Sequence, residues 1–521
     1  MSDYPDQEEV TVGAAWDRGA AIPLAWWQTR TFVLLALLAA LLPMVWPPFA
    51  PLTDAPGHIG RYRILAEAGT GPLAHHYAVH WGLIGNLGVD LLVMAFHPLL
   101  DVEPAARLVI ALIPVATVAA MLWAAREAHG RLPASAAFAL PLAYSFPFQL
   151  GFVNFCLAAA MAMAGLALWL RLARTHAAWV RVVVFIPYAG LVWVCHSFGW
   201  AMLGLFVGGA EWRLRVQAGE PWNRAGLSAA LMALPMAWPV ALMLSGAGDR
   251  LAGDTGDWFH WSAKAQWAVS LLRERWKWYD IASVTVIACL LWAAIRSKRF
   301  AFAGVLGLPA LLALAAFLAL PRLFQGGADV DMRILPYAAA LGVLAIRVTP
   351  DHRAFERTLA VLATGFFALR TATTTIAFLL FSQGQQAALR AIDAIPPGSA
   401  VLVLVDEPSL KSWFNPRLSH VAGIAIARRR VFTNEQWALA GQQLIRPLHP
   451  RAAPFDADPS QIVHPPGSSN DQSVDFDLAI AHFDRCTFQR VWTIGFPAGR
   501  AHAADLSLVW SDGRSAVYAV R

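Results

Sequence analysis

Long apolar runs separated by short polar connections dominate the chain from residue 31 to residue 381. The first run, Thr31 to Trp46, follows Trp26, Trp27 and Arg30 and has no small-x-small cleavage site, so it is expected to remain as an anchor. Further runs that could cross a bilayer lie at roughly 104–125, 133–150, 152–170, 180–195, 197–210, 225–245, 279–295, 300–320, 334–348 and 358–381. The pattern predicts a mainly α, polytopic helical membrane protein of about 11 spans.

The overall composition supports this prediction. Charged residues make up 14% of the 521 residues and hydrophobic residues 58%, with 23 Trp, whereas soluble domains carry about 25% charged residues. A water-soluble fold has too little interior for so much apolar side chain, so a wholly soluble enzyme is excluded. Four Cys are too few for a disulfide scaffold.

The pattern changes after residue 381, where charges become denser and the apolar segments shorter. Residues 382–521 are therefore predicted to form a small α/β domain, which begins with a helix at 387–395. Strands are expected at 400–405, 421–426, 491–494, 506–510 and 516–520, and a long loop at 447–473. No nucleotide loop or nucleophile elbow is present, so acceptor binding or a structural cap is the expected role of this domain.

The distribution of basic residues predicts the orientation in the membrane. Five short connections are basic: Arg126/Arg131, Arg171/Arg174/Arg181, Arg213/Arg215/Arg224, Arg296/Lys298/Arg299 and Arg347/Arg353/Arg357. Connections 147–151 and 195–199 have no Lys or Arg. Because basic loops stay in the cytoplasm, the C-terminal domain is expected outside an inner (plasma) membrane, in the periplasm or extracellular space. The net charge of +6 is spread over these loops, so no nucleic-acid partner is expected.

One segment leaves the number of spans open. Residues 83–100 are apolar but contain Asn86, Asp90 and His97. A lone Asp in lipid needs a polar partner, so an interfacial helix is favoured over a twelfth span. With an interfacial segment, residues 1–30 form a cytoplasmic tail and residues 47–103 a long external loop.

This first loop carries the main candidate site. Pro51 and Pro56 flank Thr53 and Asp54, and a short helix is expected from about Gly57. Helical spacing places His58 on one face with either Arg61 or Tyr62, so an acid, an imidazole and a guanidinium lie within two turns. The competing interpretation is a helix-capping Asp with an Arg that reaches toward water.

The chain resembles the C-type (GT-C) membrane glycosyltransferases in its order of elements: one anchor, a long first loop with an early Asp, two interfacial helices and many spans. This superfamily includes protein O-mannosyltransferases and aminoarabinose transferases. The segments that carry the resemblance are Asn86–Leu87, Ala105–Leu108, Arg126, Gly130, Gly151–Phe155 and Gly441–Gln443. The resemblance implies transfer of a hexosyl or pentosyl group from a polyprenyl-phosphate carrier to an acceptor hydroxyl on the outer side of the membrane.

By the same resemblance, Asp54 is the general base or the carboxylate that positions the acceptor. A hydroxyl nucleophile must lose a proton, whereas a phosphate leaves readily when cations neutralise it. The second external loop, 147–151, lacks the acid that many members carry, so a metal-independent reaction is favoured over one that uses a divalent metal, and no cofactor is expected. Membrane lipids and a glycan, lipid or protein acceptor are the expected partners.

Five more residues complete the predicted substrate site together with His58: Arg61, Asn154, His196, Arg333 and Arg370. Arg333 and Arg370 could bind the lipid phosphate, because a guanidinium matches phosphate geometry. The alternatives are structural: a local Asp–Arg pair for Arg333, a hydrogen-bonded Arg within the helix bundle for Arg370, and a packed or capping His196. Other functions left open are a lipid-linked oligosaccharide ligase or polymerase, a transporter or flippase, and a noncatalytic scaffold.

Overall fold

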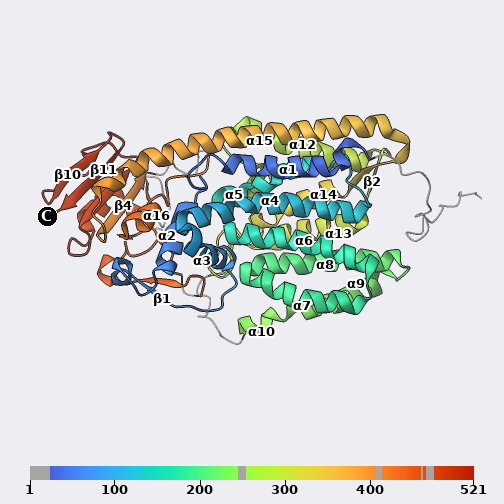
Figure 1. Ribbon diagram of the computed structural model, residues 1–521, viewed down its shortest axis with the longest axis horizontal. Helices are drawn as coiled ribbons and strands as arrows, with labels where there is room; N and C mark the ends of the chain where they lie inside the picture. The colour runs from blue at the N-terminus through green and yellow to red at the C-terminus, as the bar shows by residue number, and fades with distance from the viewer. Residues whose placement is uncertain (1–23, 245–253, 407–412, 440, 459–461, 465–473) are drawn as a thin grey trace, which may run out of the picture.

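The computed structural model describes residues 24–244, 254–406, 413–439, 441–458, 462–464 and 474–521. Most of the predicted cytoplasmic tail, residues 1–23, lies outside these ranges. A helical body occupies most of the elongated molecule, and the C-terminal domain lies at one end of it (Figure 1).

Apolar helices build the body, as the hydrophobic runs predict. Five segments are long and apolar enough to cross a membrane: α4 (Val102–His129), α6 (Val153–Thr175), α7 (Ala178–Cys195), α12 (Lys277–Arg296), and Pro350–Ala394, which contains α15 (Arg353–Leu389). Other helices of the body are α1 (Arg30–Leu41), α8 (Ser197–Gln217), α9 (Trp222–Ala233), α13 (Gly304–Ala319) and α14 (Leu335–Leu344). The prediction of a mainly helical, multi-pass membrane protein is confirmed.

Two runs that we expected to be single spans are broken. Residues 133–150 form two 3-10 turns, η4 (Ala136–Phe138) and η5 (Leu140–Tyr144), followed by the short helix α5 (Phe146–Leu150). Residues 225–245 are interrupted between α9 and α10 (Pro239–Leu244) by a 3-10 turn. The breaks coincide with prolines, which lack the N–H that an α-helix requires and clash with the preceding turn.

The basic connections lie together at the end of the body opposite the C-terminal domain. The short strand β2 (Phe300–Phe302) pairs with β3 (Ile346–Val348) there (Figure 1). Arg174 donates to Glu127, and this bond joins the connection that contains Arg174 to the one that contains Arg126 and Arg131. His129 bonds the carbonyl oxygen of Leu344. Five connections separated in sequence thus form one basic end, as the charge pattern predicts.

A seven-stranded mixed sheet forms the centre of the C-terminal domain. Its central strand β4 (Ala400–Asp406) is parallel to three neighbours, β5 (Phe432–Thr433), β7 (Ile462–His464) and β9 (Arg490–Ile494). Beyond β9, the strand β11 (Ser515–Val520) pairs antiparallel with β9, and β10 (Leu506–Ser511) pairs antiparallel with β11 and forms one edge of the sheet. On the other side, β8 (Val474–Asp475) pairs with β7 and forms the opposite edge. The predicted α/β class is confirmed, and so are the strands at 400–405, 491–494, 506–510 and 516–520.

Two details of the predicted domain are wrong. Residues 421–426 belong not to a strand but to a turn and helix α16 (Gly423–Arg429), and the expected loop 447–473 contains β7. The segment at 421–426 is buried on all sides, and a short, wholly apolar run does not distinguish a strand from a buried helix.

The first loop is attached to the C-terminal domain. Strand β1 (Tyr77–Val79) of the loop pairs antiparallel with β6 (Ile445–Pro447) of the domain, and α2 (Ala55–Ala66) packs against α16. In addition, α15 continues without a break past residue 382, from the basic end into the domain (Figure 1). The loop and the domain therefore form one unit at this end of the molecule.

Candidate functional site

Asp54 begins helix α2, but its side chain makes no capping hydrogen bond to that helix. Its backbone N–H donates to the carbonyl oxygen of Leu150 at 2.9 Å. Gly151 faces it with φ +100°, and a Cβ there would lie 2.9 Å from the Asp54 nitrogen, so only glycine fits. The Asp54 side chain is 17% exposed. The capping alternative is thus wrong, and the Asp54 side chain is not wholly buried.

Three ionisable side chains of the C-terminal domain surround this carboxylate. Nε2 of His420 lies 3.9 Å from Oδ1 of Asp54. On the other side of the ring, Nδ1 lies 3.2 Å from Oε2 of Glu435 and 3.9 Å from Oδ1 of Asp458. The ring of Trp437 packs on the imidazole with 4.4 Å between centroids. Sequence reasoning missed all four, because it assigned the domain only a general role.

The charges of this cluster are coupled. Burial raises the pKa of Asp54 to about 6, although the nearby His420 opposes the rise. Burial alone would lower the pKa of His420, but Asp458, Glu435 and Asp54 together raise it to about 9. Near pH 7, Asp54 is therefore mostly ionised and His420 is an imidazolium.

His58 lies one helical turn after Asp54, and it is a neutral group. Burial, followed by the charge of Arg61, holds the pKa of His58 well below its usual value. Nε2 lies 3.2 Å from the carbonyl oxygen of Gly151, so this nitrogen carries the hydrogen and donates it. Nδ1 is buried and has no hydrogen-bond partner among the described residues. This nitrogen is therefore a buried acceptor that no described residue satisfies.

Arg61 and Asn154 lie next to this cluster and share a partner, Asp90 of helix α3 (Gly88–Leu100). Arg61 pairs with Asp90 at 2.9 Å and donates to Gln443 of the C-terminal domain at 2.9 Å. Asn154 donates to Asp90 at 2.9 Å. Asp90 thus has the polar partner that its apolar segment requires. The 13-residue helix α3 is about 20 Å long, which is short for a span and fits the interfacial interpretation.

Arg333 lies within electrostatic range of Asp54. Its guanidinium lies 4.4 Å above the ring of Phe152 and is close enough to lower the pKa of Asp54. It donates to the carbonyl oxygen of Ala328 at 3.0 Å, whereas its buried Nε has no partner among the described residues. His196 is half-buried within electrostatic range of Arg333, and its Nδ1 accepts from the N–H of Phe198 at 3.1 Å, as the capping alternative predicts.

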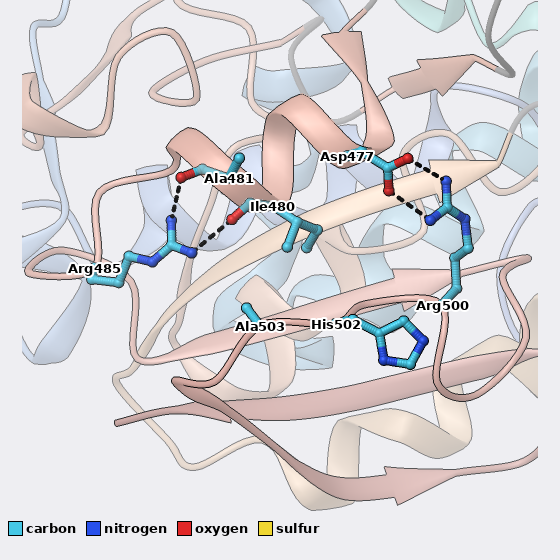
Figure 2. Close-up of a pocket in the computed structure, with 7 residues that line it drawn as sticks. All are labelled: Asp477, Ile480, Ala481, Arg485, Arg500, His502 and Ala503. Atoms are coloured by element: carbon cyan, nitrogen blue, oxygen red, sulfur yellow. Dashed lines mark hydrogen bonds and ion pairs between the residues drawn. The ribbon is translucent and has the colours of Figure 1, made fainter.

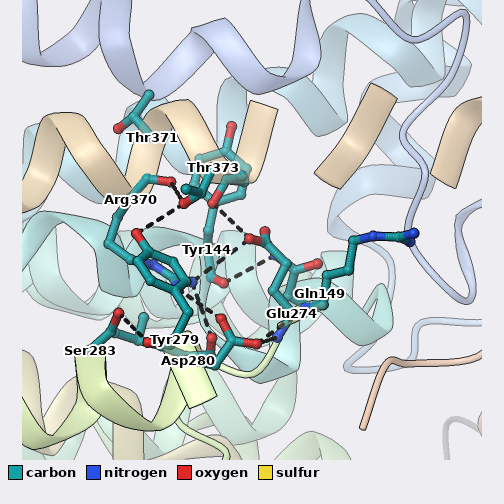
Figure 3. A network of polar contacts seen from close by, with 12 residues as sticks. Tyr144, Gln149, Glu274, Tyr279, Asp280, Ser283, Arg370, Thr371 and Thr373 are labelled. Atoms are coloured by element: carbon teal, nitrogen blue, oxygen red, sulfur yellow. Dashed lines mark hydrogen bonds and ion pairs between the residues drawn. The ribbon is translucent and has the colours of Figure 1, made fainter. Parts of the chain in front are cut away.

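Arg370 belongs to another cluster (Figure 3). Its guanidinium pairs with Asp280 at 2.8 Å, donates to the carbonyl oxygen of Leu272 at 3.1 Å and lies 3.8 Å from Glu274. The ring of Tyr279 covers it at 5.0 Å. Protein groups thus surround Arg370 within the helix bundle, which is the structural alternative, and it does not join the residues around Asp54.

Arg417 is a further residue that the sequence did not reveal. It donates to the carbonyl oxygens of Pro51 and Gln149 at 2.9 and 2.7 Å, and to the Gln149 side chain at 2.6 Å. Burial lowers its pKa to about 9. Arg417, a residue of the C-terminal domain, therefore holds together the two segments of the chain that carry Asp54 and Gly151. Its signal in the sequence was no stronger than that of any other Arg.

A cavity of about 290 Å³ lies in the C-terminal domain, apart from Asp54 (Figure 2). Around it, both guanidinium groups have protein partners: Arg500 pairs with Asp477, and Arg485 donates to the carbonyl oxygens of Ile480 and Ala481. None of the predicted site residues lines this cavity. Among the residues that the structure describes, no group of three or more His, Cys, Asp or Glu side chains is arranged to hold a metal ion.

The fold and the site together define a multi-pass helical membrane protein whose first loop and C-terminal domain form a polar cluster at one end. No protein-family model and no curated protein matches the sequence. Two crystal structures of ArnT from Cupriavidus metallidurans are similar to it. The apo structure has a TM-score of 0.48 and 14% identity. The structure bound to undecaprenyl phosphate has a TM-score of 0.46 and 13% identity. Each alignment covers 94% of this chain and 97% of ArnT. Likeness at this level does not establish a shared function.

Proposed function

We propose that the protein is a membrane glycosyltransferase that moves a sugar from a polyprenyl-phosphate carrier to an acceptor hydroxyl. The reaction takes place on the outer side of an inner (plasma) membrane, with the C-terminal domain in the periplasm or extracellular space. The donor sugar is a hexosyl or pentosyl group, and the acceptor is a glycan, a lipid or a protein. The reaction requires neither a metal nor a cofactor.

The observation that carries this proposal is the position of Asp54. Its carboxylate is partly exposed and not used as a helix cap. Its pKa of about 6 is that of a base that is ionised near neutral pH yet can accept a proton. Arg333 is half-buried and lies within electrostatic range of Asp54, and its bond to one backbone carbonyl oxygen leaves other guanidinium donors for a phosphate.

The residues suggest how the transfer proceeds. Asp54 takes the proton of the acceptor hydroxyl as its oxygen forms a bond to the anomeric carbon of the donor sugar. The bond between that carbon and the phosphate oxygen breaks, and both of its electrons leave with the polyprenyl phosphate. Arg333 stabilises the departing anion.

The test is the release of polyprenyl phosphate by the purified protein in lipid nanodiscs. A panel of pentosyl and hexosyl polyprenyl phosphates serves as donor, glycan, lipid and protein acceptors are supplied in turn, and mass spectrometry measures the released carrier. We expect Asp54→Asn to reduce release by at least about 100-fold, because loss of a general base typically costs that much. In the unsubstituted protein, release should increase as the pH rises through about 6, because Asp54 must be ionised.

Asp101→Asn is the matched control. Asp101 is another acid of the first loop, but its side chain is 62% exposed and pairs with Arg63 away from the cluster. This variant should release carrier at the rate of the unsubstituted protein. Full release by Asp54→Asn would contradict the proposed function.

A further inference from the structure

One segment of the C-terminal domain lies along the stretch of chain that carries Asp54. Oγ1 of Thr53 donates to the carbonyl oxygen of Pro416 at 2.6 Å, and Arg417 donates to the carbonyl oxygen of Pro51. A Cβ at Gly423 would lie only 2.2 Å from the carbonyl oxygen of Pro56. Contacts on both sides of Asp54 therefore hold residues 416–423 against residues 51–56.

His420 lies in the middle of this segment, and its ring has a defined orientation. Nδ1 faces Glu435 at 3.2 Å and Asp458 at 3.9 Å, while Nε2 faces Asp54 at 3.9 Å. Only the imidazolium form donates from both nitrogens, and three carboxylates favour that form. Trp437 packs on the ring and prevents it from turning away. The charge that the ring presents to Asp54 is thus fixed in place by the protein.

We propose that His420 is a positioning residue for the Asp54 carboxylate, and that the C-terminal domain is therefore part of the reaction centre. This inference rests on the proposed function for its role in transfer, but the geometry can be tested without turnover. A separation of 3.9 Å is longer than a hydrogen bond. Asp54 is therefore attracted to the imidazolium while its lone pairs remain available for an acceptor hydroxyl.

Several other charged groups act on Asp54, and each has a defined sign. Asp458 raises its pKa, whereas Arg333 and Arg61 lower it. Arg417 also lies within electrostatic range, and His58 is neutral. Burial raises the pKa of Asp54, and among these groups His420 lowers that pKa most strongly. Removal of its charge should therefore raise the pKa of Asp54.

The experiment measures the protonation of Asp54 directly. Dicyclohexylcarbodiimide modifies protonated carboxyl groups, and mass spectrometry of the Asp54 peptide gives the extent of modification at each pH. The midpoint should lie near pH 6 in the full-length protein. His420→Gln should raise it by about one to three pH units, the usual effect of a nearby opposite charge.

Two variants control this result. His449→Gln makes the same substitution at the boundary with the first loop, where His449 bonds His76, and should leave the midpoint unchanged. Asp458→Asn removes a like charge, so the midpoint should fall below that of the unsubstituted protein. His420→Asn, a second neutral replacement, serves as the test if His420→Gln does not fold, as judged by thermal unfolding and gel filtration.

An unchanged midpoint in folded His420→Gln, or in folded His420→Asn when that variant serves as the test, would overturn the positioning role. The proposed function fails on a different observation, full carrier release by Asp54→Asn. If the midpoint shifts while Asp54→Asn retains release, His420 still controls the charge of Asp54, and the transfer reaction is the part that is wrong.

Discussion

At the scale of single residues, the partners of Arg333 and Arg370 distinguish a candidate phosphate ligand from a structural arginine. Both were candidates for binding a lipid phosphate. Arg370 is 3% exposed and surrounded by Asp280, Glu274 and Tyr279, whereas Arg333 is half-buried and donates to a backbone carbonyl oxygen, that of Ala328. An Arg already paired with two carboxylates has little capacity left for a third anion.

The two residues should respond differently to substitution. Arg333→Gln should weaken binding of undecaprenyl phosphate about 10- to 150-fold, because hydrogen bonds to charged groups contribute roughly 1.5–3 kcal/mol. Arg370→Gln should instead lower the free energy of unfolding by about 3–5 kcal/mol, because it leaves buried carboxylates unpaired. Native mass spectrometry with added undecaprenyl phosphate measures the first effect, and thermal unfolding measures the second. The reverse outcome, normal stability with lost binding in Arg370→Gln, would assign the phosphate to Arg370.

At the scale of elements, the contact between α2 and α16 brings Asp54 and His420 together. Asp54 immediately precedes α2, and His420 lies three residues before α16. The two helices approach closely because glycines face each other: a Cβ at Gly60 would lie 2.9 Å from the carbonyl oxygen of Gly423. A side chain on either glycine would have to move backbone atoms, which do not give way as a flexible side chain does.

Gly423→Ala should therefore separate the two helices. We expect a loss of about 1–3 kcal/mol of stability, as for other overpacked interiors, and a midpoint of Asp54 modification that rises as in His420→Gln. Thermal unfolding and the carbodiimide titration measure the two effects. Gly384→Ala is the control, because a Cβ at this position of α15 would meet nothing within 4 Å. Normal stability and an unchanged midpoint in Gly423→Ala would show that the close contact is not required.

At the scale of the whole molecule, the basic connections and the C-terminal domain occupy opposite ends (Figure 1). Basic loops remain in the cytoplasm, so the domain and the candidate site should face outward. The helix α15 connects the two ends directly. The orientation of this one molecule therefore determines the side on which any reaction at Asp54 takes place.

This orientation can be tested with the exposed Cys486 of the C-terminal domain in a Cys289→Ser background. A membrane-impermeant maleimide should label Cys486 in spheroplasts without permeabilisation. Ala218→Cys, combined with Cys486→Ser in the same background, places an exposed thiol in a basic connection at the other end. It should react only after permeabilisation. The opposite order of labelling would place Asp54 in the cytoplasm and contradict the proposed function.

The sequence by itself determined the class of the protein, most of its helices and the grouping of its basic loops. Lipid solvation imposes long apolar runs and an asymmetry of Lys and Arg, and both are visible residue by residue. It also made Asp54 a candidate, because two prolines and a helix start mark a rigid turn and the resemblance places an acid there. The helix at 423–429 was mistaken for a strand, because burial on all sides removes the periodicity that distinguishes the two.

Only the tertiary structure decided which charges share a site. His420, Glu435 and Asp458 lie more than 360 residues from Asp54 in sequence, and they meet it because β1 pairs with β6 and α2 packs on α16. Likewise, only the fold separated Arg370 from Arg333. The physical reason is that the pKa of a carboxylate and the free capacity of a guanidinium depend on neighbours within about 4–6 Å, and spacing along the chain does not specify those neighbours.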